Sequence, residues 1–120
     1  MALIINPNVK HIDATLTALA DPTRRRVIDA LRSGPRRPGE LATTVGMSSP
    51  ALSRHLRVLR SSGLVEAHLT NEDARVRVYR LRHEPFVALQ AWLDQVETFW
   101  GDQLDAFKAH VERTRKRRAK

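Results

Sequence analysis

Serines and arginines alternate with leucines in the stretch SSPALSRHLRVLRSSGLV, residues 48–65. Leu52, Leu56 and Leu59 recur at helical spacing, so they predict the buried side of an amphipathic helix. The opposite side then presents hydroxyl and guanidinium groups, and a guanidinium can bind guanine through two hydrogen bonds at once. The side chains expected on this side are Ser49, Ser53, Arg54 and Arg57. This pattern indicates nucleic-acid binding.

His55 lies between the two sides of this helix. Its imidazole can fill the edge of the core, contact a phosphate or contact a base, and the sequence leaves these alternatives open. Three consecutive bases, Arg24, Arg25 and Arg26, also have two interpretations. They either form a solvent-exposed helix face or bring at least one guanidinium to the nucleic-acid backbone.

No residue pattern in the chain is typical of catalysis. There is no cysteine, which excludes disulfides, thiolate zinc sites and cysteine nucleophiles. The histidines are scattered, and the sequence shows neither a glycine-rich phosphate loop nor paired carboxylates suited to acid–base chemistry. We therefore predict no enzyme activity, no catalytic residue, no metal and no cofactor.

Positive charge is concentrated in two parts of the chain. The net charge is +8, and residues 21–82 hold 13 arginines against 6 acids. Residues 83–112 hold one lysine against 6 acids, and residues 113–120 hold 6 bases and no acid. This distribution indicates a basic working surface in the middle, an acidic element turned elsewhere and a basic tail. We expect the tail to be disordered and to strengthen binding to any DNA sequence alike.

The elements that position the basic surface can be predicted from apolar periodicity and capping residues. A first helix covers about residues 11–20. Its predicted inner side consists of Ile12, Leu16 and Leu19. A second helix begins at Asp21-Pro22, because Asp21 can cap free N–H groups and Pro22 suits the first helical position. Its predicted inner side consists of Val27, Ile28 and Leu31.

A third, short helix is predicted over residues 40–45, closed by Gly46, and Ser48 is the expected cap of the fourth. Two short helices joined by a tight turn that contains glycine form a helix-turn-helix pattern. The N-terminal half of the second helix of such a pair enters the major groove of DNA. The hydroxyl and guanidinium groups of residues 48–57 are clustered in that half.

Two β-prone runs, residues 64–70 and 75–81, predict a β-hairpin after the helix-turn-helix. Val76 and Val78 alternate with other residues in the second run, so one side of the hairpin can pack on the helices. The residues expected on the other side are Arg75, Arg77 and Tyr79. Such a hairpin is a wing, whose guanidinium groups would lie against the adjacent DNA backbone or minor groove.

The last segment, residues 84 to about 113, predicts a helix that is too long for its domain, about 40 Å. Because a bulky apolar stripe is uncommon on a monomer, we predict that a second copy of the chain covers it, together with the first helix. The alternative is a helix folded back over its own core. The predicted dimerisation residues are Ile12, Leu16, Leu19, Leu89, Trp92, Leu93, Val96, Phe99, Trp100, Leu104 and Phe107.

The chain is predicted to form one domain over residues 1–112, followed by the tail over residues 113–120. No stretch is apolar for long enough to span a bilayer, and the short N-terminal apolar run has no basic lead. We therefore expect a cytoplasmic protein without a membrane partner. The aromatic residues of the last helix either pack or line a cavity for an apolar effector.

The residues resemble the ArsR/SmtB-type winged-helix repressors of bacteria. ALADPTRRRVIDAL is similar to the start of that family's second helix, GELATTVGMSSPALSRHLRVLRSSGLV to its helix-turn-helix, and RVRVYRL to its second wing strand. The resemblance is close over residues 16–81. It implies a mainly α fold with a β-hairpin wing, a winged helix-turn-helix that dimerises through its first and last helices.

The resemblance also implies a function. A homodimer would bind an inverted-repeat operator in double-stranded DNA near a promoter and block transcription. The recognition residues implied by position are Ser48, Ser49, Ser53, Arg54 and His55, and Arg75 and Arg77 of the wing would hold phosphate.

Many members of that family sense metals, and this chain departs from their sites. It has no cysteine around Glu40-Leu41-Ala42, where the arsenic, cadmium and lead sensors have thiolates. Zinc and nickel sensors pair an aspartate with a histidine two residues later on the last helix, whereas here Asp94 is followed by Val96 and His110 has no histidine partner nearby. The resemblance is therefore to members without a metal site, and it names no effector.

The sequence favours a sequence-specific, homodimeric repressor. Two alternatives remain: a nonspecific architectural protein that binds DNA or RNA, and a protein-interaction module that uses a winged helix without nucleic acid. Arg54 discriminates among them, because only the first function needs its guanidinium for sequence preference.

Overall fold

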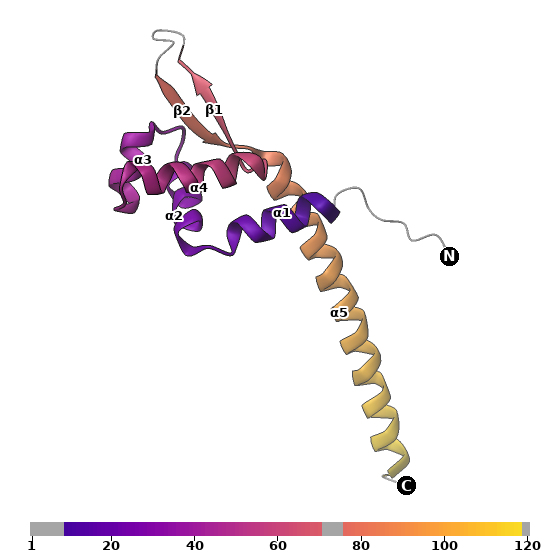
Figure 1. The fold of residues 1–120 in the computed structure, drawn as a ribbon. Coiled ribbons are helices and arrows are strands. Elements are labelled where there is room, and N and C mark those ends of the chain that lie inside the picture. The colour runs from indigo at the N-terminus through magenta and orange to yellow at the C-terminus, as the bar shows by residue number, and fades with distance from the viewer. Residues whose placement is uncertain (1–8, 71–75, 119–120) are drawn as a thin grey trace. The chain divides into compact units, whose positions relative to one another are not determined.

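A computed structural model of the chain describes residues 9–70 and 76–118. The elements follow in the order α1, α2, α3, α4, β1, β2 and α5 (Figure 1). The chain divides into two compact units, Met1–Ala88 and Leu89–Lys120, which we call the N-terminal and C-terminal units. The boundary between the two units lies inside α5, after Ala88, whereas the predicted boundary follows residue 112. Over the described residues, no helix is both long enough and apolar enough to cross a membrane.

Helix α1 (Val9–Leu19) is predicted correctly as a helix, but its buried side is not. The structure buries Ile12, Thr15 and Ala18, whereas Leu16 is 43% exposed. The apolar pattern does not include Thr15, whose hydroxyl donates to the carbonyl of His11 at 2.8 Å and so has a partner inside the core. Leu16 thus lies on the outer side of α1.

Helices α2 (Pro22–Leu31) and α3 (Pro38–Val45) pack together in the N-terminal unit. The predicted cap of α2 is confirmed, because the Asp21 carboxylate accepts hydrogen bonds from the backbone N–H groups of Thr23 and Arg24 at 2.7 and 3.1 Å. Helix α3 begins two residues earlier than predicted, since Pro38 takes a position where no N–H donor is needed. Gly46 ends α3 in the left-handed conformation.

Helix α4 (Ser49–Ser61) begins as predicted. The Ser48 hydroxyl accepts from the backbone N–H of Ala51 at 3.4 Å, which confirms the predicted cap. Gly63 follows the helix with a φ of 80°, and the N–H of Leu64 returns to the carbonyl of Leu59 at 3.0 Å. The buried residues of α4 are Leu52, Leu56 and Leu59, as predicted.

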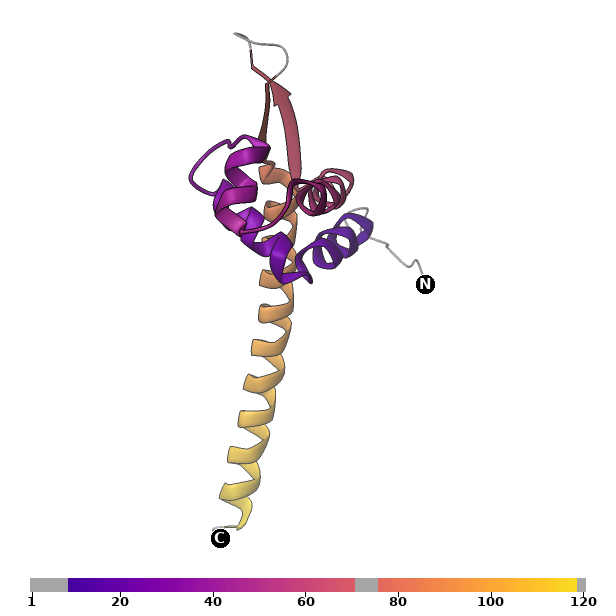
Figure 2. The ribbon, with the colours of Figure 1, turned by 60° about the vertical axis from the view of Figure 1, so that its left-hand side comes forward.

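Strands β1 (Val65–Leu69) and β2 (Arg77–Leu81) form the predicted antiparallel hairpin, with Ala67 opposite Tyr79. The hairpin projects beyond the helices of the N-terminal unit in both views (Figures 1 and 2). The predicted sides of the second strand are inverted, because Tyr79 is 6% exposed and joins the core. By strand alternation Arg77 shares the side of Tyr79, farther along the hairpin, whereas Val78, predicted to pack on the helices, lies on the opposite side with His68. The N–H and C=O of Tyr79 bond to the C=O and N–H of Arg36 at 2.8 and 3.0 Å, so the loop before α3 pairs with the hairpin at this point.

Helix α5 (His83–Arg118) is one residue longer at its start than predicted and continues through most of the predicted tail. The tail prediction is therefore wrong for residues 113–118, which are helical. Arginine and lysine are good helix formers, and four bases in the last turn oppose the negative end of the helix dipole. No described residue of α5 is fully buried, and Phe86 near its start packs partly against the core of the N-terminal unit.

Candidate nucleic-acid interface

The exposed side of α4 gathers the polar residues predicted to contact nucleic acid. Its leucines are at most 3% exposed, so they define the side of the helix that faces the core. The predicted residues that remain exposed are Ser48, Ser49, Ser53, Arg54 and Arg57. The hydroxyl and guanidinium groups therefore point away from the core, on a helix whose orientation is set by tight packing.

Arg54 and Arg57 carry charge that the protein does not neutralise. Within residues 9–70 and 76–118, neither guanidinium forms an ion pair, although other arginines of the N-terminal unit do. An exposed, unpaired guanidinium can bind a phosphate or a guanine without first breaking an internal contact. This is the electrostatic arrangement that a nucleic-acid surface requires.

The wing has two chemically different sides. Glu66 receives a hydrogen bond from Arg80 and lies 3.0 Å from His68 Nε2 and 4.0 Å from Arg82 Nε. The hydrogen bond from His68, followed by that from Arg80, holds the pKa of the Glu66 carboxyl below its ordinary value. Arg80 and Arg82 are thus partly neutralised within the hairpin.

Arg77 lies on the other side of the hairpin, is exposed, and has no ion pair within the described part of the chain. Together with Arg60 of α4 it lines a hollow of about 180 Å³ between the end of α4 and the hairpin. Sequence reasoning missed Arg60, although its spacing of three residues from Arg57 was a signal. Arg75, the other predicted wing base, lies outside the described residues.

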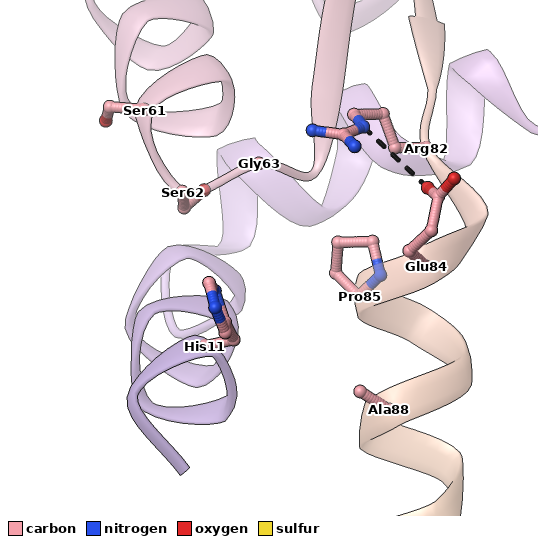
Figure 3. Close-up of a pocket in the computed structure, with 8 residues that line it drawn as sticks. All are labelled: His11, Ser61, Ser62, Gly63, Arg82, Glu84, Pro85 and Ala88. Carbon is pink, nitrogen blue, oxygen red and sulfur yellow. Dashed lines mark ion pairs between the residues drawn. The ribbon is translucent and has the colours of Figure 1, made fainter. Parts of the chain in front are cut away.

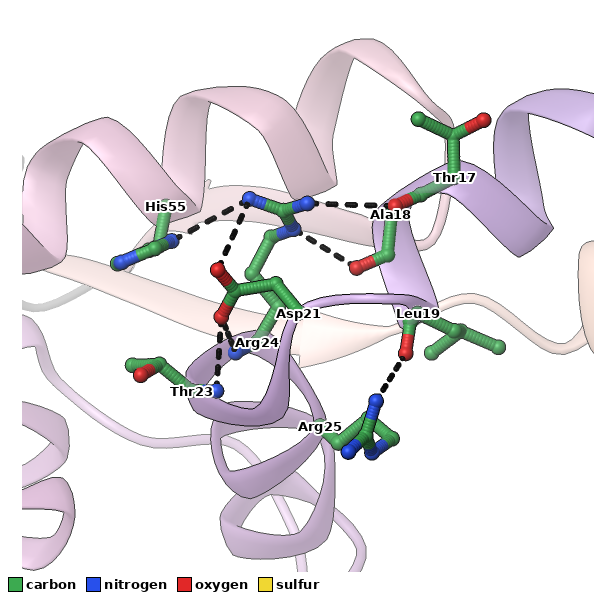
Figure 4. Close-up of polar contacts among 8 residues, drawn as sticks. All are labelled: Thr17, Ala18, Leu19, Asp21, Thr23, Arg24, Arg25 and His55. Atoms are coloured by element: carbon green, nitrogen blue, oxygen red, sulfur yellow. Dashed lines mark hydrogen bonds and ion pairs between the residues drawn. The ribbon is translucent and has the colours of Figure 1, made fainter.

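His55 has a partner that the sequence did not suggest. Its Nδ1 lies 3.5 Å from Nη1 of Arg24 in α2 (Figure 4). Arg24 and Arg25 also donate to carbonyls at the end of α1, at 2.7 Å to Ala18 and 2.8 Å to Leu19. Two of the three consecutive arginines are therefore engaged within the protein, and Arg26 remains exposed.

The cap residue Asp21 belongs to the same group of contacts. The backbone hydrogen bond from Arg24 is the main cause that holds the pKa of the Asp21 carboxyl below its ordinary value of 3.8, and the N–H of Thr23 acts in the same direction. The positive charge of Arg24, whose Nη1 lies 3.9 Å from Oδ2, contributes as well.

A cavity of about 330 Å³ lies between α1, the end of α4 and the start of α5 (Figure 3). Four of its five polar side chains, all but His11, have partners within the described residues. The hydroxyls of Ser61 and Ser62 donate to backbone carbonyls of α4, and Arg82 lies 3.7 Å from the carboxylate of Glu84. Among the described residues, no cluster of three histidines, aspartates or glutamates could hold a metal ion.

The C-terminal unit displays an uncovered apolar stripe. Trp100, Leu104 and Phe107 are 59%, 63% and 66% exposed, and Phe99 packs edge to face on Trp100 with ring centroids 6.0 Å apart. The predicted dimerisation residues of α5 that are exposed or half-buried are Leu89, Trp92, Leu93, Val96, Phe99, Trp100, Leu104 and Phe107. Of the α1 set, Ile12 is buried within its own unit, Leu19 is half-buried and packs partly against the core, and Leu16 is exposed.

Comparison with known proteins gives matches over most of the chain. Residues 21–67 match the family described as bacterial regulatory protein, arsR family. The chain is 38% identical over 100 residues to HTH-type transcriptional regulator Rv2034 of Mycobacterium tuberculosis, a match that covers 83% of this chain and 88% of that protein.

Two solved structures share the fold. An ArsR-like transcriptional regulator from Rhodococcus sp. RHA1 matches with a TM-score of 0.75 and 25% identity, over 86% of this chain and 92% of that one. The homodimeric winged helix-turn-helix DNA-binding domain Mb0332 from Mycobacterium bovis matches with a TM-score of 0.58 and 31% identity, over 74% of this chain and 79% of that one.

Proposed function

The chain belongs to the arsR family of bacterial regulatory proteins and is a winged helix-turn-helix transcriptional regulator, and from this premise we propose that it acts as a homodimeric repressor. Two copies bind the half-sites of an inverted-repeat operator in double-stranded DNA and exclude the transcription machinery from the promoter. The observation that carries the proposal is the exposed, unpaired serine and arginine side of α4. The protein acts in the cytoplasm, where its DNA lies.

The N-terminal half of α4 is the part that enters the major groove. Arg54 there contacts base edges, and Ser49 and Ser53 reach bases or phosphates. Ser48 caps the helix and presents its N-terminus, and thus the positive end of its dipole, to the phosphate backbone. Arg57 and Arg60 continue the basic side toward the wing, where Arg77 holds phosphate with them.

The apolar stripe of α5 is covered by the α5 of a second copy. Exposed side chains as large as Trp100, Leu104 and Phe107 would otherwise remain in water, and burial of each stabilises an assembly by about 1.5 to 3 kcal/mol. The homodimeric Mb0332 domain, whose fold this chain shares, supports the assembly. Leu16 and Leu19 of α1 extend the same interface.

Charge along α5 favours an antiparallel pair. Residues 89–105 hold four acids and no base, whereas residues 106–118 hold six bases and one acid. Parallel copies would place like charges side by side, but antiparallel copies place the acidic half of one against the basic half of the other. The basic residues of the predicted tail therefore have a role in pairing.

The apolar stripe has the same symmetry. Trp100 and Phe107, and likewise Val96 and Val111, lie at equal distances from a midpoint between residues 103 and 104. When two copies pair antiparallel about this midpoint, Trp100 meets the partner's Phe107. Glu97, which flanks the stripe, then lies close to the partner's Lys108.

The proposal is tested by selecting bound fragments from the source genome and footprinting the enriched sequence. We expect two symmetric half-sites with centres about 10 base pairs, or one DNA turn, apart. Uniform protection of unrelated fragments with equal affinity would instead favour the nonspecific architectural protein and would overturn the proposed function.

A further inference from the structure

Arg24 joins three elements of the N-terminal unit (Figure 4). Its Nε donates to the carbonyl of Ala18 at 2.7 Å and its Nη2 to that of Thr17 at 3.2 Å, both at the C-terminal end of α1. Its Nη1 lies 3.9 Å from the Asp21 carboxylate at the start of α2 and 3.5 Å from Nδ1 of His55 in α4. Each nitrogen of the planar guanidinium thus faces a different group.

These contacts fit the chemistry of a buried cation. The Arg24 side chain is only 16% exposed, so its charge needs partners that replace water. The guanidinium supplies donors to two of the carbonyls that end α1, those of Ala18 and Thr17, the second of which also accepts from the N–H of Ala20 at 3.3 Å. A lysine could not reach the same partners together, because its single ammonium lacks the planar fork.

The contact with His55 connects Arg24 of α2 to α4. A guanidinium N–H can only donate, so a hydrogen bond at this contact requires the tautomer of His55 whose Nδ1 accepts. His55 follows Arg54 in the sequence, and Arg54 lies on the side of α4 that we propose enters the major groove. A small rotation of α4 would move Arg54 off its base while leaving the leucines in the core.

We propose that Arg24 is a positioning residue for DNA recognition, which holds α4 at a fixed orientation to α1 through His55. This inference rests on the proposed function, because it assumes that α4 reads an operator. Arg24 does not itself bind phosphate, since its N–H groups are directed at protein acceptors. Its loss reduces the preference for operator over random DNA and leaves the salt dependence of binding unchanged.

Arg25 provides a matched control. Among the hydrogen bonds and ion pairs of the described residues, none joins Arg25 to α4, yet Arg25 carries the same charge and donates to a carbonyl at the same end of α1, that of Leu19, at 2.8 Å. We compare R24Q with R25Q by titrating operator and random DNA at several salt concentrations. R24Q should lower the operator preference about tenfold and R25Q by no more than about twofold. A salt slope lower by about 1 in R24Q alone would show a phosphate contact and overturn the inference.

Variants of His55 test the same contact without disturbing α1. His55→Ala removes the atom that accepts from Arg24. His55→Asn keeps an acceptor there, because the asparagine Oδ1 takes the place of Nδ1. We expect H55A to lose about as much operator preference as R24Q, H55N to retain most of it, and the double variant R24Q/H55A to lose no more than either single variant. Losses that multiply in the double variant would mean that the two residues act independently, which contradicts the inference.

Thermal unfolding of each variant shows whether it is folded at the titration temperature. If R24Q is unfolded there, H55A tests the contact between Arg24 and His55 in its place. The two proposals fail separately. If the wild-type protein has no operator preference, the proposed function is wrong. If the wild type prefers its operator and both R24Q and H55A keep that preference, only the role of Arg24 is wrong.

Discussion

Arg54 projects from the exposed side of α4 with no acidic partner in the described part of the chain. We expect Arg54→Ala to reduce the preference for operator over random DNA by about 1 to 3 kcal/mol, because a bidentate contact to a base is lost. Competition titrations measure this preference. Arg32→Ala is the control: it removes one exposed arginine, paired with Asp29 at 3.8 Å, and should weaken both DNAs alike. An unchanged preference in R54A would contradict base recognition by this residue.

Asp21 gives the N-terminal unit a pH dependence in acid. Its folded-state pKa lies below its ordinary value of 3.8, so the carboxylate stabilises the fold at every pH above that value. This contribution is lost as pH falls through the folded-state pKa. Urea unfolding between about pH 5 and about pH 3 should therefore show a smaller loss of stability in Asp21→Asn than in the wild type. Equal losses would show that the cap carboxylate does not titrate differently in the folded chain.

The sequence predicted which residues of α4 face outward, because the spacing of Leu52, Leu56 and Leu59 identifies the buried side of a helix. It could not predict the pairing of Arg24 with His55, which are 31 residues apart and meet only through tertiary packing. Tyr79 was misplaced for a related reason. Strand alternation identifies two sides of a hairpin, but the chain segment at Arg36 that covers one of them is not part of that pattern.

At the scale of elements, the antiparallel pairing of α5 can be tested by crosslinking. Because the chain has no cysteine, only introduced cysteines can form a disulfide. In an antiparallel pair, Leu93 of one copy lies near the partner's Thr114, and the two copies of Gln103 lie near each other. Oxidation should therefore crosslink Gln103→Cys with itself, and a mixture of Leu93→Cys and Thr114→Cys as a heterodimer. Neither L93C nor T114C should crosslink alone.

Parallel copies would reverse this result, since each single variant would then face itself. Crosslinking of L93C alone, in a protein that sediments as a dimer, would contradict the antiparallel arrangement without affecting the existence of the dimer. The two outcomes thus separate the orientation of the helices from their association.

Helix ends were predicted less well than helix identities. Asp21 and Ser48 were recognised as caps because their side chains accept from the first free N–H groups. The end of α5 was missed because a dense basic run was taken as a solvated tail, although such residues suit the last turns of a helix.

At the scale of the whole molecule, DNA binding should depend on association of two copies. Leu104→Glu places a carboxylate in the middle of the apolar stripe and should raise the dimer dissociation constant about 100-fold. Sedimentation measures the dissociation constant, and operator affinity should fall with it. Thr98→Glu adds the same charge to an exposed position on the opposite side of α5 and should leave both unchanged. A dimer insensitive to L104E would exclude this stripe as the interface.

The backbone pairing of Arg36 with Tyr79 has a mechanical consequence. A hairpin of two strands is only marginally stable by itself, and here a third segment stiffens its base. The wing therefore keeps its tilt when the protein binds. If the minor groove is too wide or too narrow for it, the DNA has to deform. We expect sequences that narrow or widen this groove at low elastic cost to be favoured even at base pairs that no side chain touches.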